Sequence, residues 1–133
     1  HLIVKNLTND GLSKYMHKLS NAYAQYYNTK HETSGHVFQG AYKAKIIDDD
    51  NYMQYLSAYI HLNPRELNKW RGREITYEWS SFQDYEKNRW GELINTDFIL
   101  NNYANFSEYL AYVIESGAKE QDIANVQHSV LDK

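Results

Sequence analysis

The sequence predicts an α+β fold, on three observations. Two short apolar segments, residues 1–4 and 41–47, have the composition or the alternation of β-strands. Residues 11–29 and 50–62 instead repeat apolar side chains with helical spacing. The order is therefore strand, helix, strand, helix, and the chain beyond residue 95 adds only short helical segments. At 133 residues, the chain is long enough for one domain with a real core.

The first half of the chain supplies a strand, a helix and a second strand. Residues 1–4 form a short apolar run suited to a buried strand. The helix at 11–29 has an apolar stripe suited to a core, and its polar face carries Lys14 and Lys18, which suit either solvent or a DNA backbone. Alternation over residues 41–47 places Lys43 and Lys45 on one face of the second strand.

The helix at 50–62 carries the candidate chemistry. Acidic residues at 48–50 suit its N-terminus, and Pro64 cannot continue it. Tyr59 and Asn63 are four residues apart, so the phenol and the amide are neighbours. A phenol is a possible covalent nucleophile, and an amide oxygen is a possible cation ligand. The alternative is an ordinary buried face, because Tyr59 also belongs to a tyrosine stripe of helical spacing.

The later segments predict helices at 96–102, 107–116 and 119–126. Asn105 or Ser107 suits the cap of the second, and Gly117 suits its end. Residues 65–81 are irregular and rich in arginine and tryptophan. Of the two tryptophans there, Trp79 is expected to pack on the core.

Composition limits the class of protein. The chain has no cysteine and no apolar run long enough for a membrane span, so we expect a cytoplasmic protein without disulfides and without a membrane partner. The formal net charge of −3 is uneven. Residues 1–73 carry ten basic and six acidic side chains, and residues 74–133 carry four and eleven. A basic half suits phosphate binding, although ordinary surface variation explains it equally well.

Six segments together resemble the single-tyrosine HUH transposases, most closely those of the REP-associated type. They lie in the order typical of that family, at residues 1–4, 11–16, 34–40, 48–52, 59–64 and 79–82. The resemblance implies a ferredoxin-like fold, an antiparallel sheet with helices packed on it, over residues 1–85. Residues 86–133 are then a helical C-terminal extension. A bacterial source is implied as well.

The resemblance also implies an activity. Such enzymes bind single-stranded, hairpin-forming DNA and cleave and rejoin it through a 5′-phosphotyrosine, with Mg²⁺ or Mn²⁺ at the site. Carried onto this chain, Tyr59 takes the nucleophile position, and His1 and Asn63 take two metal-ligand positions. The first histidine of the family's pair falls two residues before His1, so we expect an N-terminally truncated domain with an incomplete metal site. The edge of a truncated sheet invites pairing with a second copy.

Basic side chains interleaved with aromatic ones are the expected DNA contacts. They are Lys14, Lys18, Lys43, Lys45, Arg65, Lys69, Arg71 and Arg73. A solvated loop is the alternative for the arginine-rich stretch. Two other functions stay open: a non-catalytic nucleic-acid-binding remnant, and an oligomerising module whose acidic tail contacts a protein.

Overall fold

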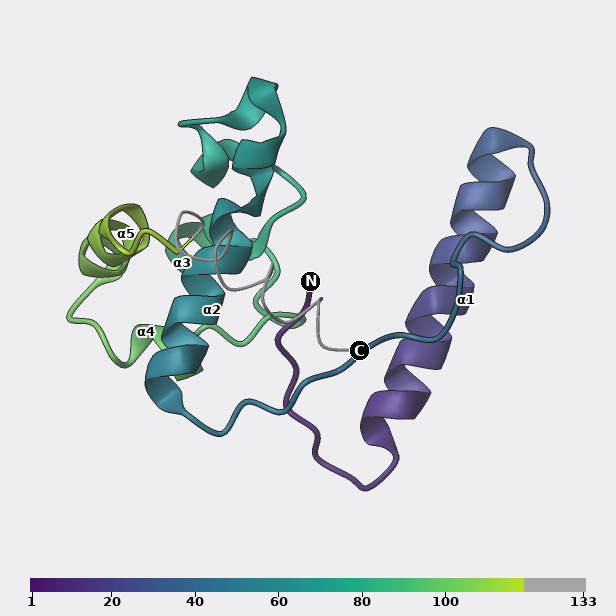
Figure 1. The fold of residues 1–133 in the computed structure, drawn as a ribbon, viewed down its shortest axis with the longest axis horizontal. Coiled ribbons are helices and arrows are strands. Elements are labelled where there is room, and N and C mark those ends of the chain that lie inside the picture. The colour runs from purple at the N-terminus through teal and green to yellow at the C-terminus, as the bar shows by residue number, and fades with distance from the viewer. Residues whose placement is uncertain (119–133) are drawn as a thin grey trace, which may run out of the picture. The chain divides into compact units, whose positions relative to one another are not determined.

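The computed structural model describes residues 1–118 and divides the chain into two compact units. The N-terminal unit is Leu2–Ile46, and the C-terminal unit is His1 together with the chain from Ile47 onwards. The first unit contains one long helix, and several shorter helices lie in the second (Figure 1). The expected boundary near residue 85 stays a prediction, and the expected helix at 119–126 lies outside the described residues.

The N-terminal unit is built on α1 (Gly11–His31), which confirms the helix expected from the apolar repeat. The helix ends at Glu32, whose φ of 51° lies in the left-handed region. None of its residues is buried within the described structure, so its apolar stripe does not cover a core there. Neither α1 nor any other described helix has the length and apolarity needed to cross a bilayer.

Up to residue 118, the C-terminal unit contains four α-helices and a series of single 3-10 turns. The α-helices are α2 (Asp50–Leu62), α3 (Asp84–Lys87), α4 (Asp97–Leu100) and α5 (Phe106–Glu115). The turns are η1 (Asn63–Glu66), η2 (Asn68–Trp70), η3 (Glu74–Thr76) and η4 (Ser81–Gln83). The helices expected at 50–62, 96–102 and 107–116 are confirmed, the middle one shorter than expected.

The core of this unit lies mainly between α2 and α5 and is completed by η4 and α4. Its members are buried apolar side chains from each of these elements and from the turn after α5. They are Met53, Ala58, Leu62, Phe82, Ile99, Tyr109, Val113 and Ala118. Burial of this set removes the apolar face of α2 from water, which is the main stabilising term for a helix of this length.

The start of α2 is held by a side-chain cap. The Asp49 carboxylate accepts a hydrogen bond of 2.6 Å from the backbone N–H of Tyr52, as the acidic run predicts. We expect Asp49→Ala to lower the free energy of unfolding by about 1 kcal/mol, because one helix N–H loses its acceptor. Urea denaturation followed by tryptophan fluorescence measures the change. Asp48→Ala is the control, and an equal loss in both variants contradicts the cap.

The expected α+β, ferredoxin-like fold is wrong for the described part of the chain. Residues 1–118 contain helices and irregular segments and no β-strand, so the structure is helical. Residues 1–4 and 41–47 are irregular, because a strand needs a neighbouring strand for its backbone hydrogen bonds and the described residues provide none. The expected self-association through a sheet edge loses its basis with the sheet.

Candidate functional site

Two of the predicted site residues, far apart in the sequence, lie together in the C-terminal unit. The His1 imidazole meets the Tyr59 ring edge to face, with the ring centroids 6.3 Å apart and the planes at 71°. Tyr59 lies on the last turns of α2, partly exposed, with its ring packed against the core. The helix fixes the phenol by this packing, while His1 comes from the irregular start of the chain.

Asn63 stands at the C-terminal end of α2, four residues after Tyr59. Its backbone is still helical, at φ −52° and ψ −37°, and its N–H donates to the carbonyl of Ile60. The next residue, Pro64, is buried and continues into η1. The proline therefore ends α2 where the sequence predicted, and the helical spacing of the phenol and the amide is kept.

The metal-ligand set is small. No group of three or more histidine, cysteine, aspartate or glutamate side chains in residues 1–118 is placed to hold a metal ion. The predicted ligands are one imidazole and one amide, His1 and Asn63, and protein sites for divalent ions ordinarily supply more. A site for Mg²⁺ or Mn²⁺ at His1 and Asn63 stays a prediction.

A buried polar network, which the sequence did not predict as a unit, lies beneath the same helix. His61 is 2% exposed, and its ring lies parallel to that of Phe82. Its Nδ1 is 2.7 Å from the Tyr109 hydroxyl, and its Nε2 is 2.9 Å from Ser81 Oγ. The Tyr109 hydroxyl also meets Ser57 Oγ at 2.7 Å. Each imidazole nitrogen thus has a hydroxyl partner, which satisfies either neutral tautomer.

Burial keeps His61 uncharged. Burial lowers its pKa to about 3, and the Asp84 carboxylate opposes that shift only in part. Burial also raises the pKa of the Tyr109 phenol well above its usual range. Both groups are therefore neutral at pH 7, and the arrangement is structural. It joins α2, η4 and α5 through hydrogen bonds inside the core.

Arg65, one of the predicted DNA contacts, forms an ion pair with a carboxylate of the same unit. Its Nε lies 3.1 Å from an oxygen of Glu74, which is 8% exposed. The same oxygen accepts from the backbone N–H of Gly72 at 3.1 Å. Although burial acts to raise the pKa of Glu74, these donors lower it overall. Removing Arg65 would leave a buried carboxylate without its cation, so its main role is to hold η1 and η3 together.

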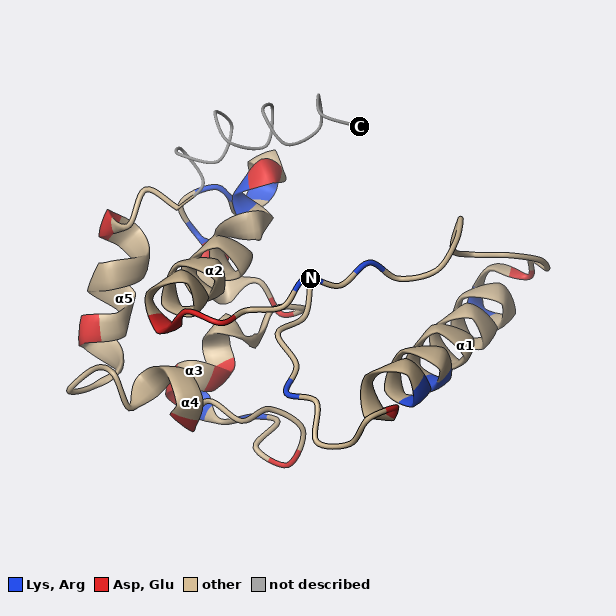
Figure 2. Ribbon diagram, turned by 60° about the horizontal axis from the view of Figure 1, so that its bottom comes forward, with Lys and Arg blue, Asp and Glu red and all other residues tan. Residues whose placement is uncertain are grey.

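Three other predicted contacts lie on the segment around Trp70, and two of them contact its ring. The Lys69 Nζ lies 5.1 Å and the Arg73 guanidinium carbon 5.7 Å from the centroid of the indole. Arg73 Nη2 also donates to the Lys69 carbonyl at 2.7 Å, and Arg71 Nε reaches the Arg65 carbonyl at 3.5 Å. Lys69, Arg71 and Arg73 are all exposed. Two cations, Lys69 and Arg73, thus lie over one aromatic ring, and Arg71 lies on the same basic segment after α2, whose ribbon is partly blue in Figure 2.

Trp79 does not pack on the core. Its side chain is 80% exposed, which contradicts the expectation from its place among apolar neighbours. The core position of that segment is filled by Phe82, which is 2% exposed. Sequence spacing did not separate the two rings, because the segment is a series of 3-10 turns without a fixed apolar period.

The remaining predicted DNA contacts lie in the N-terminal unit. Lys14, Lys18, Lys43 and Lys45 are exposed, and Lys14 pairs with Asp10 at 2.6 Å. Both members of that pair are largely solvated, so it contributes little to stability. The predicted basic residues are therefore shared between the two units.

Comparison with known proteins adds no assignment: no protein-family model, no curated protein and no solved structure matches the chain.

Proposed function

We propose that this chain binds single-stranded, hairpin-forming DNA and cleaves and rejoins it through Tyr59 during DNA transposition. The observation that carries the proposal is the contact between the rings of His1 and Tyr59. The sequence resemblance assigns both residues to one site, and 58 positions separate them along the chain. Their contact in the C-terminal unit supports a common role.

The proposed step transfers one phosphodiester. The Tyr59 phenol oxygen attacks the phosphorus, the bond from phosphorus to the 3′ oxygen breaks, and the phenol proton ends on the released 3′-hydroxyl. The downstream fragment stays esterified to Tyr59 through its 5′-phosphate. Attack by a 3′-hydroxyl on this phosphotyrosine reverses the exchange and frees the phenol, so no nucleotide cofactor is consumed. No step is assigned to a metal ion, because the described residues lack a full ligand set.

The segment after α2 supports DNA contact in the same unit as Tyr59. Lys69, Arg71 and Arg73 are exposed and lie on η2 and the turn that follows it. Cations attract the phosphate backbone, and a ring such as Trp70, which is only partly covered, suits stacking by a base. Arg65 is left out of this surface because of its ion pair with Glu74.

The test is a covalent adduct. The full chain is incubated with labelled hairpin-bearing single-stranded DNA, in Mn²⁺ and in EDTA, and resolved on a denaturing gel. We expect an adduct in the wild type, its loss in Tyr59→Phe, and its retention in Tyr55→Phe. Tyr55 is the matched control because it is one turn earlier on α2, is also partly exposed, and donates its hydroxyl to the Ala118 carbonyl at 2.8 Å. An adduct that survives Tyr59→Phe contradicts the proposal.

A second function is favoured by the small ligand set. With only His1 and Asn63 as candidate ligands in residues 1–118, a DNA-binding remnant without cleavage activity is the alternative. The same gel separates the two, when paired with a binding measurement. DNA bound equally by the wild type and by Tyr59→Phe, with no adduct in either buffer, supports the remnant.

A further inference from the structure

The exposed side of α1 carries a cluster of aromatic rings, here called the aromatic patch. Tyr23 is its centre: its ring centroid lies 6.5 Å from that of Tyr26, 6.3 Å from Tyr27 and 5.8 Å from Phe38. The Tyr27 ring in turn contacts His31 at 4.4 Å. Between 38% and 57% of each tyrosine or phenylalanine in the patch is exposed, so the rings keep free faces.

A cavity of about 300 Å³ adjoins the patch within the same unit. It lies between α1 and the loop at 35–40, and Phe38 belongs to both the cavity and the patch. Polar groups from Ser20, Asn21 and His36 line it beside apolar ones. A concave site with a few polar groups among apolar walls is the usual form of a small-molecule or base pocket.

The shape of that loop is set by α1 itself. The Asn28 amide donates to the Gly35 carbonyl at 3.1 Å, and its oxygen accepts from the Thr33 hydroxyl at 3.0 Å. Gly35 has a φ of 102°, which lets the chain turn back at this point without strain. The Asn28 side chain on α1 therefore holds the loop that forms one wall of the cavity.

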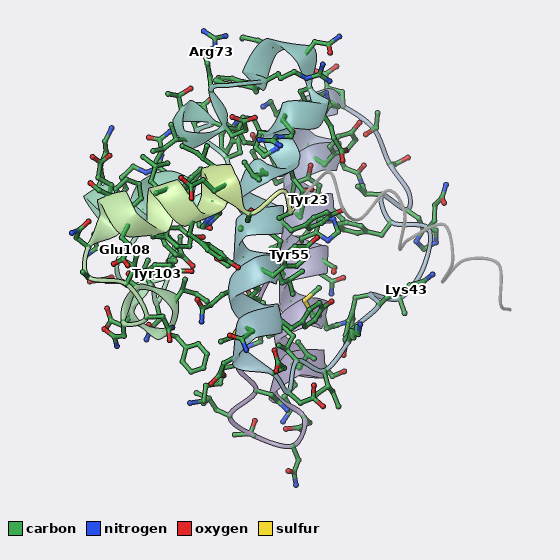
Figure 3. All side chains as sticks on the ribbon, turned by 60° about the vertical axis from the view of Figure 1, so that its left-hand side comes forward. Tyr23, Lys43, Tyr55, Arg73, Tyr103 and Glu108 are labelled. Atoms are coloured by element: carbon green, nitrogen blue, oxygen red, sulfur yellow. The ribbon has the colours of Figure 1, made fainter. Side chains whose placement is uncertain are left out.

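The unit that carries the patch is basic. Leu2–Ile46 holds six lysines against two acidic side chains, a net charge of +4. Lys30 Nζ lies 5.4 Å from the centroid of the Tyr26 ring and 3.0 Å from its hydroxyl, at the edge of the patch. Lys43 lies on the segment that follows the loop, and Tyr23 lies on α1 (Figure 3). Positive charge beside exposed rings is complementary to a polymer of phosphates and bases.

We propose that the aromatic patch and its cavity form a binding site for single-stranded DNA. Bases stack on Tyr23 and its neighbouring rings, one base edge reaches the polar groups of the cavity, and lysines neutralise phosphates. The proposal rests on the proposed function for its substrate class, and it adds the rings and the cavity of the N-terminal unit, which the predicted contacts did not include.

The chemistry of the patch favours DNA over a second copy of the chain. A two-fold contact would place the same patch on both partners, so two surfaces of net charge +4 would face each other. A purely apolar covering surface would also exclude water from the tyrosine hydroxyls of the patch, although Tyr26 would keep its contact with Lys30 Nζ. A DNA strand supplies negative charge, flat rings and polar edges together.

The test measures the affinity of the full chain for a fluorescent oligothymidylate by anisotropy. We expect Tyr23→Ala to weaken binding about tenfold, because a stacking surface is lost. Tyr15→Ala is the matched control, since Tyr15 is on the same helix and, like Tyr23, is 48% exposed. We expect that control to bind as the wild type does. An unchanged affinity in Tyr23→Ala, or an equal loss in both variants, overturns the proposal.

A second pair of variants tests the site without changing the patch. Asn21→Ala alters the cavity wall and removes the contact of the Asn21 amide with His17 Nε2, and Lys30→Gln removes the cation at the Tyr26 hydroxyl while keeping every ring of the patch. We expect weaker binding from Asn21→Ala, and from Lys30→Gln a logarithmic salt dependence that falls by about 0.7. Circular dichroism verifies that each variant keeps the helix content of the wild type. Wild-type affinity and salt dependence in both of these variants overturn the proposal.

Different results would contradict the proposed DNA-binding site on the aromatic patch and the proposed covalent step at Tyr59. At saturating DNA, Tyr23→Ala should still form the Tyr59 adduct, since only affinity is reduced. If the wild type binds DNA through the patch and forms no adduct, the covalent step is wrong and the binding site stands. If sedimentation shows a DNA-free oligomer that Tyr23→Ala alone dissociates, the patch belongs to a second copy and the proposal is overturned.

Discussion

Tyr109→Ala is expected to lower the free energy of unfolding by about 3–5 kcal/mol, the range for removal of a large buried aromatic side chain. Tyr109 is 0% exposed and lies at the centre of the core. Its ring stacks on Tyr85 at 5.0 Å and meets Tyr103 edge to face at 5.2 Å. The variant loses these contacts and leaves a cavity between α5 and α2. Urea denaturation followed by tryptophan fluorescence reports on this unit, since Trp70, Trp79 and Trp90 all lie in it.

The hydroxyl of Tyr109 is tested separately with Tyr109→Phe. That variant keeps the ring and removes the shared partner of His61 Nδ1 and Ser57 Oγ. Because both groups are buried, we expect a loss of about 1–3 kcal/mol. Tyr103→Phe is the control: its hydroxyl meets only Gln54 Oε1, at 2.8 Å, in a partly exposed place. A Tyr109→Phe variant that is no less stable than Tyr103→Phe would rule out the network as a stabilising element.

The helices were predictable because their signals are local. The apolar repeat of residues 11–29 and 50–62, the acidic cap at Asp49 and the break at Pro64 all act within a few residues. The cap of α5 is equally local, since the Asn105 side chain accepts from the Glu108 N–H at 3.1 Å. Each of these features can be recognised from a few neighbouring residues, without reference to the rest of the chain.

The strands failed for the opposite reason. Apolar alternation shows only that a segment suits a sheet, and a sheet forms when another segment pairs with its backbone. Residues 1–4 and 41–47 have the composition of strands, but no other segment of the described chain pairs with them. The stripe of α1 shows the same limit. Its spacing predicts a helix correctly, but periodicity does not say what covers the stripe, and none of its residues is buried.

The candidate site was predicted in part. Helical spacing and the family resemblance placed Tyr59, Asn63 and His1 together, and the contact between His1 and Tyr59 is present. The hydrogen-bond network of His61 was missed because its partners Ser81 and Tyr109 are 20 and 48 positions away. The one local signal was Ser57, four residues before His61 on the same helix face. Among the 13 tyrosines of the chain, no sequence feature distinguished Tyr109 as a buried hydrogen-bonding residue.

His61 makes the stability of the C-terminal unit depend on pH. Its pKa is about 3 when folded and returns to about 6.5 when the chain unfolds. Between these values the unfolded state binds more protons, so stability increases with pH in that window. The full contribution is present above pH 6.5 and is lost as pH falls toward 3. Between pH 7 and pH 5 we expect a loss of about 2 kcal/mol from this residue.

Denaturation curves at pH 7, 6 and 5 measure that loss, and His61→Gln should flatten the dependence. His36→Gln is the control, because His36 is an exposed histidine of the N-terminal unit. A direct readout needs no variant: the ring proton shifts of His61 in the folded protein should stay at their neutral-form values at pH 5. Burial of the ring, rather than a missing acceptor, is the cause, because the hydroxyl oxygens of Ser81 and Tyr109 can accept from a doubly protonated ring. A His61 ring that protonates near pH 6 in the folded chain would show that water reaches the network, and the predicted loss would disappear.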